Sequence, residues 1–386
     1  MGNSPLYKKH HSIENFHSSK NQDYLDAQID RSVALIQAAI ESKSLDKRYS
    51  QIISYVLNDL LKSTRGQKTD FKIVPFIAEE METLEDDSVI QYLYHRYRYD
   101  VFSQKYVLDE FPPYIQIEPT SFCNLRCVFC YQTDKTFSRS SSGFMGSMTF
   151  GLFKEIIDQL EGNVEFISLA SRGEPLLCKE IDKMLEYCIG KFLGLKINTN
   201  ASTLTERQAH AILSGGVKTL VFSVDSTEES LYSKFRVGGN LKKIIKNIEM
   251  FQNIRAEQYT QSKLITRVSG VMFDPEKQKI KTMVDFWGSL VDQVSFVKYN
   301  PWENIYRSKY NSVTNPCSDL WRRMFIWYNG LVNPCDCDYK SRLAVGNIKE
   351  KTVKELWQSK EYDYLREKHL SSGRQGLEPC RRCALT

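Results

Sequence analysis

The sequence predicts an α/β fold: a partial barrel of six strand–helix units, with a helical segment before it and a cysteine-rich tail after it. Apolar residues in the first 110 positions recur at three- and four-residue steps, which is typical of helices. Between Tyr114 and Tyr299, short apolar runs alternate with amphipathic stretches, and this alternation indicates βαβ units and a parallel sheet. The alternation stops after Asn315, where a small α+β domain carrying five cysteines is predicted.

The composition is that of an ordinary globular protein, with 41% hydrophobic and 26% charged residues among 386. The net charge of +5 is dispersed, so no nucleic-acid partner is expected. No apolar run reaches the roughly 18–20 residues that span a bilayer, and the N-terminus lacks a signal-peptide core, so we expect no membrane association and a cytoplasmic location. In that compartment cysteines are more often metal ligands than disulfides.

Three domains are expected: an N-terminal extension over 1–110, the barrel over 111–312 and the tail over 313–386. Residues 1–20 are polar and are predicted to be disordered. Helical patterns follow over Asp23–Leu61 and Ser88–Ser103, and Asp86 and Asp87 are candidate caps for the second. This extension contains no motif that indicates a role.

Pro112 and Pro113 mark the start of the barrel. The predicted strands are Tyr114–Glu118, Glu165–Ala170, Leu195–Thr199, Thr219–Asp225, Ile265–Met272 and Gln293–Tyr299. The predicted helices are Thr149–Glu161, Lys179–Ile189, Thr205–Ser214, Leu241–Ile254 and Glu276–Leu290. In barrels of this kind the chemistry gathers at the carboxyl ends of the strands.

Three cysteines, Cys123, Cys127 and Cys130, follow the first predicted strand at spacings C-x3-C-x2-C. Thiolates are the usual ligands of iron–sulfur clusters, which normally take four of them. Three thiolates in one loop leave one iron open to another ligand, as catalytic metal sites do. The alternatives are a structural zinc loop or three unrelated buried thiols. Zinc loops favour a C-x2–4-C pair completed by a distant second pair, which this triplet fits poorly.

This spacing, with Phe129 directly before the last cysteine, resembles the signature of the radical S-adenosylmethionine (radical SAM) enzymes. The resemblance implies that Cys123, Cys127 and Cys130 hold a radical-generating 4Fe–4S cluster. It implies that SAM binds the open iron and is cleaved to a 5′-deoxyadenosyl radical, with Phe129 against the adenine. It also implies an electron donor such as flavodoxin or ferredoxin.

Further polar residues at the predicted strand ends extend the resemblance. Ser171-Arg-Gly-Glu-Pro175 stands where the family usually has Gly-Gly-Glu-Pro, a loop that holds the methionyl amine of SAM. Two positions differ, so Gly173 and Glu174 are the binders that the resemblance carries over. A glycine permits close backbone approach, and the acid can pair with an ammonium group.

The third and fourth strands end in further candidates for the SAM pocket. Asn200 resembles the family's Thr-Asn strand end, although an Asn-capped turn explains it equally well. Ser223 and Asp225 resemble a Ser-x-Asp pattern that faces the ribose and carboxylate of SAM. Arg236 is a candidate contact to the SAM carboxylate or the substrate, with an exposed loop arginine as the alternative.

The tail resembles the SPASM/Twitch extension of radical SAM enzymes. The resemblance rests on a predicted hairpin at Asn329-Gly330 and on four cysteines, which are Cys317, Cys335, Cys380 and Cys383. It implies the shorter Twitch form, in which these four hold one auxiliary 4Fe–4S cluster. The alternative is a structural zinc site made by the same four. Cys337 is an ambiguous ligand, and with Cys178 and Cys188 it is either a buried small hydrophobe or a hydrogen-atom donor.

The expected function is a radical SAM oxidoreductase of dehydrogenase or epimerase type, acting on a sugar, nucleotide sugar or aminocyclitol. Tyr299, Trp302 and Tyr306 are candidates to line a carbohydrate pocket or the core. The competing hypothesis is a peptide- or protein-modifying maturase. Many of those carry an N-terminal recognition domain with a β hairpin, whereas residues 1–110 predict helices. A non-enzymatic binding protein with a vestigial barrel would require the cysteine triplet and Glu174 to be coincidences.

Overall fold

The computed structural model describes residues 21–385, which form two compact units, 21–109 and 110–385. The predicted disorder of residues 1–20 lies outside the described residues. None of the described helices is long and apolar enough to cross a membrane.

The first unit is helical, as predicted. Its helices are α1 (Gln22–Glu41), α2 (Lys47–Thr64), α3 (Pro75–Glu82) and α4 (Asp86–Tyr97), which continues as a π-helical turn over Arg98–Phe102. The prediction that Asp86 and Asp87 cap α4 is wrong, because Glu85 is the N-cap residue and both aspartates lie in the first turn. There their charges favour the helix N-terminus through its dipole.

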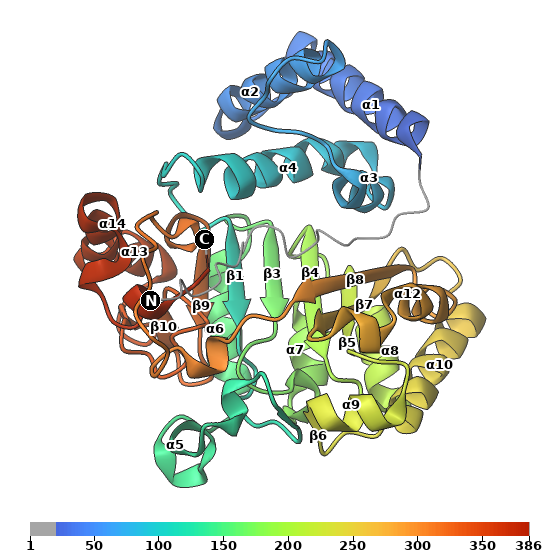
Figure 1. Cartoon of the computed structure of the whole chain (residues 1–386). Helices are drawn as coiled ribbons and strands as arrows, with labels where there is room; N and C mark the ends of the chain where they lie inside the picture. Colours follow the sequence, from blue (N-terminus) through green and yellow to red (C-terminus); the bar gives the residue numbers. More distant parts are fainter. Residues whose placement is uncertain (1–20, 386) are drawn as a thin grey trace. The chain divides into compact units, whose positions relative to one another are not determined.

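The second unit is built on a sheet that contains the predicted barrel strands in parallel neighbouring order (Figure 1). These strands are β1 (Tyr114–Ile117), β3 (Phe166–Leu169), β4 (Gly194–Thr199), β5 (Thr219–Ser223), β7 (Ile265–Met272) and β8 (Gln293–Lys298). The register aligns Ile117 with Leu169 and Ile197, which are all fully buried. The other face of the same strands carries Gln116 and Ser168. The sheet therefore has an apolar face and a more polar one.

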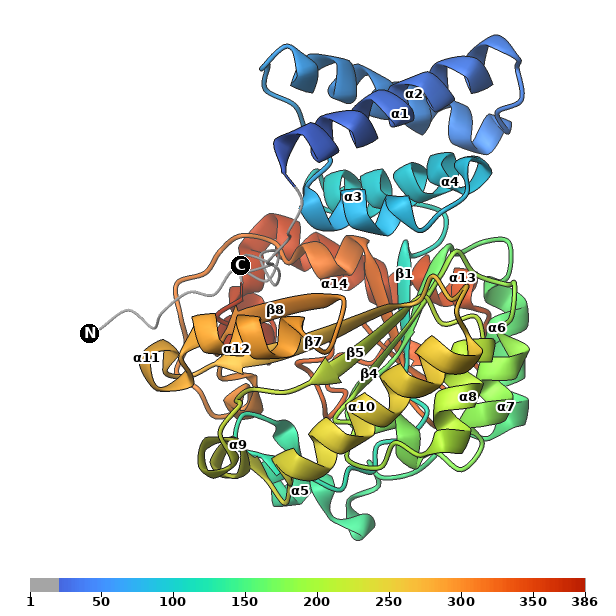
Figure 2. The same cartoon turned by 90° about the vertical axis from the view of Figure 1, so that its right-hand side faces the viewer.

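The crossover helices are α6 (Phe150–Leu160), α7 (Ile181–Tyr187), α8 (Glu206–Ser214), α9 (Glu229–Phe235), α10 (Leu241–Gln258), α11 (Pro275–Gln278) and α12 (Ile280–Gly288). Helices α6, α7, α8 and α10 pack in series along one side of the sheet (Figure 2). The prediction of a single helix over Glu276–Leu290 is wrong, because Lys279 takes a left-handed conformation with φ of +48° and divides α11 from α12.

The tail continues the sheet of the barrel. Strand β9 (Arg323–Ile326) pairs in parallel with β1, and β10 (Leu331–Asn333) pairs antiparallel with β9. The predicted hairpin is confirmed, since Gly330 has φ of +85° in the turn between them. Strand β11 (Gly346–Asn347) and helices α13 (Val353–Trp357) and α14 (Lys360–Ser372) follow. The barrel and the tail thus share one nine-stranded sheet, while the domain border at 312 stays a prediction.

A separate two-stranded ribbon holds the cysteine loop. Strand β2 (Arg126–Cys127) pairs antiparallel with β6 (Arg236–Val237), which directly follows α9. The short helix α5 (Lys135–Ser138) comes after the loop. Both strands of the ribbon have two residues, so no periodicity marked them in the sequence.

Candidate active site

The loop after β1 brings the three predicted cysteines into one apolar cluster. Cys127 and Phe129 are buried in it, and Cys123 and Cys130 pack against it. Burial raises the pKa of the Cys123 thiol to about 12 and also raises the pKa values of Cys127 and Cys130. Thiols in such a place need a positive partner, such as a metal, to exist as thiolates.

Arg236 lies beside this cluster and is already paired. Its guanidinium donates to both carboxylate oxygens of Asp225, at 2.5 and 3.0 Å, and both residues are buried. Its Nη1 lies 4.0 Å from Sγ of Cys127, and its charge partly offsets the effect of burial on the pKa of that thiol. Asp225 also accepts the backbone N–H of Val271 at 2.7 Å. The predicted SAM contacts Asp225 and Arg236 therefore meet in one ion pair against Cys127.

The loop of Gly173 and Glu174 crosses directly over the start of the cysteine loop. A Cβ added at Gly173 would lie 2.3 Å from the carbonyl oxygen of Thr120 and 2.5 Å from that of Phe122, so only glycine fits. Glu174 donates its backbone N–H to the same Phe122 carbonyl at 2.8 Å. The predicted close approach is present, and the neighbouring backbone is that of the cysteine loop.

The Glu174 carboxylate is buried and accepts three hydrogen bonds. Oε1 accepts from the Thr199 hydroxyl at 2.6 Å and from the Leu176 N–H at 3.2 Å, and Oε2 accepts from the Asn200 N–H at 2.7 Å. Burial raises its pKa. A carboxylate has about four acceptor positions, so Oε2 keeps capacity for one more donor. That capacity fits an ammonium ligand.

Asn200 is tied to the cysteine loop, whereas Ser223 is placed by its strand alone. The Asn200 amide donates to Asn124 at 3.1 Å, and Asn124 in turn donates to Ser202 at 2.7 Å. Ser223 ends β5, in register with Ser269 of β7. The ring of Phe129 lies 4.9 Å from that of Phe273. The site roles of these residues remain predictions.

The tail brings its four predicted cysteines together. Burial raises the pKa of Cys380, and the next contributions come from the charges of Cys335, Cys383 and Cys317. The buried guanidinium of Arg374 interacts electrostatically with all four. Cys317 donates its backbone N–H to Nδ1 of buried His369 at 3.0 Å. Four thiols around a buried cation form a candidate metal centre.

The spacing of the sulfurs bears on which metal the cysteines suit. Within residues 21–385, the one group of three ligand atoms that all lie within 4.8 Å of one another is Cys335, Asp336 and Cys337. Zinc–sulfur bonds of about 2.3 Å would bring tetrahedral ligand sulfurs to about 3.8 Å. Neither the loop triplet nor the tail quartet forms such a group among the described residues, so their sulfurs lie farther apart than the ligands of a bound zinc ion would.

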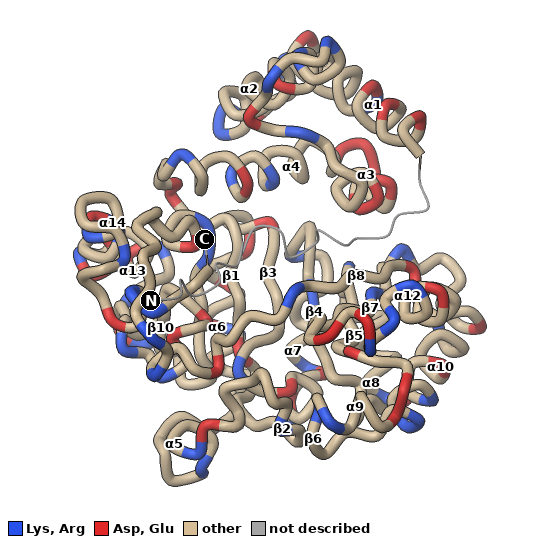
Figure 3. Tube along the Cα trace, viewed as in Figure 1, with Lys and Arg blue, Asp and Glu red and all other residues tan. Residues whose placement is uncertain are grey.

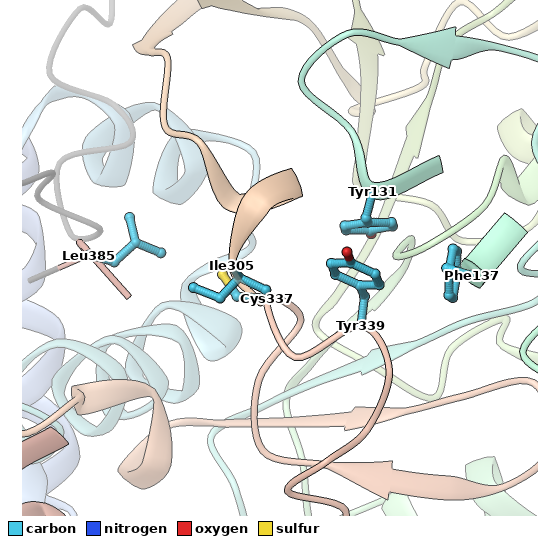
Figure 4. Packing of buried hydrophobic residues seen from close by; sticks show 6 residues of the cluster. All are labelled: Tyr131, Phe137, Ile305, Cys337, Tyr339 and Leu385. Atoms are coloured by element: carbon cyan, nitrogen blue, oxygen red, sulfur yellow. The ribbon is translucent and has the colours of Figure 1, made fainter. Parts of the chain in front are cut away.

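An aromatic cluster lies between the two cysteine sets. Tyr131, Phe137, Ile305, Cys337, Tyr339 and Leu385 are its buried members (Figure 4). Cys130 packs on it from the loop, and Cys335 and Cys383 pack on it from the tail. Cys337 thus lies in the apolar core and also lines a cavity of about 120 Å³ with Trp302 and Cys383. Cys178 and Cys188 are buried, as predicted.

The most prominent residue that the sequence did not single out is Arg172, which is buried between the barrel and the tail. It pairs with Glu118 of the cysteine loop and donates to the carbonyl of Tyr339 in the tail. The sequence feature that could have pointed to Arg172 is its place in Ser171–Pro175, where the family usually has Gly-Gly-Glu-Pro. A second is Glu303, which follows the predicted last strand and accepts from the Tyr299 hydroxyl at 2.6 Å.

Two family models match the chain. The radical SAM superfamily model covers residues 117–262, and that of the iron–sulfur cluster-binding SPASM domain covers 317–384. Together with the α/β barrel and its two cysteine sets, these matches define an iron–sulfur enzyme. The chain belongs to the radical SAM superfamily and carries a C-terminal SPASM domain. The first domain implies a 4Fe–4S cluster and SAM, and the second implies auxiliary iron–sulfur binding.

Similar proteins share parts of this architecture. GTP 3′,8-cyclase of Clostridium botulinum is 30% identical over 139 residues, 35% of this chain and 42% of that protein. The match thus spans less than half the length of this curated relative. SuiB of Streptococcus suis covers 88% of both chains at 16% identity and a TM-score of 0.53. The structure of anSMEcpe with bound AdoMet covers 71% of this chain and 85% of that one, at 16% identity and a TM-score of 0.51. The last two show the fold.

Proposed function

We propose that this radical SAM enzyme oxidises or epimerises a hydroxylated small molecule such as a sugar, nucleotide sugar or aminocyclitol. A 4Fe–4S cluster and SAM held at the loop cysteines would supply the chemistry for hydrogen-atom abstraction from the substrate. Cys123, Cys127 and Cys130 would hold that cluster, and Cys317, Cys335, Cys380 and Cys383 would hold one auxiliary 4Fe–4S cluster. An electron donor such as flavodoxin or ferredoxin would serve as the redox partner.

The observation that carries the proposal is a carboxylate at the mouth of the barrel. Glu303 follows β8, and its Oε1 accepts the Tyr299 hydroxyl, whereas Oε2 is buried with no hydrogen-bond partner among the described residues. Tyr299 packs in the apolar cluster of the loop cysteines, with its ring 4.8 Å from that of Phe273. A buried acceptor oxygen without a donor is costly unless a ligand satisfies it. A substrate hydroxyl or amine is such a donor.

The chain's own part in the reaction would then be proton transfer. Burial raises the pKa of Glu303, which moves its proton affinity toward neutral pH and suits a group that takes a proton at Oε2. Tyr299 would keep Oε1 in place through its hydrogen bond. The rings of Phe129, Phe273 and Tyr299 lie side by side, with centroids 4.8 to 4.9 Å apart, and would exclude water from this side of the substrate.

The competing proposal is a peptide-modifying maturase. SuiB, which shares the fold, has a crystal structure in which it is bound to its precursor peptide SuiA. Peptides commonly bind by adding a strand to an exposed sheet edge. The described part of the first unit, residues 21–109, contains helices and no strand. We therefore favour the small-molecule substrate.

The test is anaerobic turnover of the iron-loaded protein with reductant and SAM, against panels of nucleotide sugars, aminocyclitols and short peptides. We expect 5′-deoxyadenosine formation to rise above the substrate-free rate with a hydroxylated small molecule. A rise with peptides alone would overturn the proposal.

Glu303→Gln tests the residue assignment on the substrate that the panel identifies. We expect 5′-deoxyadenosine to form while product per deoxyadenosine falls by about tenfold or more, since general-base contributions are typically about 100-fold or larger. Glu249→Gln, an exposed glutamate on α10, is the matched control and should change nothing. Equal product yield in both variants would contradict a proton-transfer role for Glu303.

A further inference from the structure

We propose that Arg172 is a positioning residue that couples the SAM-binding loop to the tail, so that SAM affinity depends on the metal loading of the tail cysteines. The inference rests on the proposed SAM and tail-cluster sites and is independent of the substrate. Arg172 directly precedes Gly173 and Glu174, and 3% of its surface is exposed. Its contacts fall into three groups, and each constrains a different segment.

The first contacts hold Arg172 to the start of the cysteine loop. Nε donates to Oε2 of Glu118 at 2.7 Å, Nη2 donates to Oε1 at 2.6 Å, and the backbone N–H donates to Oε2 at 3.2 Å. Glu118 is fully buried. A buried ion pair is worth forming only with such two-pronged geometry, and the planar guanidinium provides it where an ammonium group does not.

The second contacts hold the same guanidinium to the tail. Nη1 donates to the carbonyl of Tyr339 at 2.9 Å, and the group lies 4.2 Å above the ring of Trp327. Asn333 fixes this part of the tail to a candidate ligand, since its amide donates to the carbonyls of Cys335 and Asp338. A shift of the Cys335 loop would therefore reach Arg172 through Asn333 and the Asp338–Tyr339 backbone.

The third group of contacts fixes the backbone around Arg172, so that the SAM loop is held in place with it. Its carbonyl accepts from Gln132 at 2.5 Å, and Ser171 is held with φ of +140°, a conformation that L-residues rarely adopt. Gly173 has no room to move toward Thr120 or Phe122. A segment so tightly packed shifts as a unit, so the guanidinium sets where Glu174 lies.

A second connection runs beside this one. The ring of Tyr131 stacks on that of Tyr339 at 4.9 Å, and its hydroxyl donates to the carbonyl of Ser171 at 2.9 Å. Arg172 therefore carries part of the coupling. Coupling between two sites is reciprocal and is typically worth about 5- to 150-fold in affinity, so we expect a value near the lower end.

The test is a double-mutant cycle on SAM affinity, measured by equilibrium dialysis of the iron-loaded full-length protein. Loss of the tail cluster in Cys335→Ser/Cys380→Ser should weaken SAM binding by about fivefold in the presence of Arg172. In an Arg172→Lys background the same tail change should weaken SAM binding by less than about twofold. Lysine keeps the positive charge but lacks the planar guanidinium group, which donates to both Glu118 and Tyr339.

Two further variants separate coupling from simple structural damage. Glu118→Gln/Arg172→Met removes both buried charges and should also reduce the dependence on the tail to less than about twofold, even if R172K folds poorly. Arg322→Lys changes a buried arginine paired with Asp319 inside the tail, and it should leave the fivefold dependence intact. An equal response to tail loss in all backgrounds, or no SAM binding by the wild type, would overturn the inference. If no substrate of the panel raised 5′-deoxyadenosine formation, the SAM affinities expected here would be the same.

Discussion

Arg236 lies with Nη1 4.0 Å from Sγ of Cys127. The two residues face each other across the β2–β6 ribbon, where Cys127 is the register partner of Arg236. The arginine is held by Asp225, and its charge counters the effect of burial on the pKa of the thiol. A buried cation on β6 thus lies beside the loop that would carry the radical-generating cluster.

Arg236→Met should weaken iron binding at the loop cysteines. The change removes the positive neighbour of Cys127 and leaves Asp225 buried without its partner, which typically costs about 3–5 kcal/mol of folding free energy. We expect faster iron release to a ferrous chelator and a lower urea midpoint. In Asp225→Asn/Arg236→Met the urea midpoint should recover, while iron release stays fast. Wild-type rates of iron release in both variants would contradict a role for the cation.

Gly173→Ala should impair the SAM loop through a steric clash. The added methyl group would meet the Thr120 carbonyl at 2.3 Å, and overpacking of this kind costs about 1–3 kcal/mol. We expect a lower melting temperature and weaker SAM binding in equilibrium dialysis. Gly151→Ala is the matched control, because a Cβ there meets nothing within 4 Å in the first turn of α6. That change should be neutral or stabilising by up to about 1 kcal/mol. Equal SAM affinity in the two variants would refute the clash.

Asp338 makes folding stability fall as the pH rises. Burial raises its pKa to about 6, although the Tyr306 hydroxyl and the N–H groups of Leu343 and Arg342 donate to it. Its folded pKa lies above the unfolded value of about 3.9, so the folded state binds more protons between these values. This contribution is fully present below about pH 4 and is lost as the pH rises through 6, by about 3 kcal/mol at most.

The measurement compares urea unfolding of the wild type and Asp338→Asn at pH 4.5 and pH 7. The amide does not titrate. The free energy of unfolding of the variant, relative to that of the wild type, should therefore be higher at pH 7 than at pH 4.5. A difference in unfolding free energy that is independent of pH would show that Asp338 does not carry this effect.

Local signals in the sequence predicted the barrel well. Each predicted strand except the last is a short apolar run with an amphipathic helix before the next strand, and this alternation favours a parallel sheet covered by helices. The loop cysteines lie within eight residues of one another, so their spacing alone indicated one centre, whereas the tail cysteines are spread over 317–383 and were grouped by the resemblance. The ligand roles of both sets stay predictions. The break at Lys279 escaped prediction because a residue with φ of +48° leaves no mark on apolar periodicity.

Contacts between distant segments were not predictable. The ion pair of Arg172 with Glu118 joins residues 54 positions apart, and its bond to Tyr339 spans 167. The pairing of β9 with β1 is equally remote, and nothing in Arg323–Ile326 indicates its neighbour. Charged residues such as Arg236 look the same in a sequence whether they face solvent or a buried aspartate. Lys and Arg positions are in fact spread over the part of the chain that the structure describes (Figure 3), so charge alone does not mark the site.

Iron and sulfide counting after anaerobic purification tests the central claim, that two separate cysteine sets each hold a cluster. We predict about eight irons per wild-type chain, and about four in both the Cys123/Cys127/Cys130→Ala variant and the Cys317/Cys335/Cys380/Cys383→Ala variant, because each cubane cluster contributes four. Cys178→Ala/Cys188→Ala, which alters buried thiols outside both sets, should keep all eight. Zinc at the tail site, or no loss of iron in the loop variant, would contradict the account.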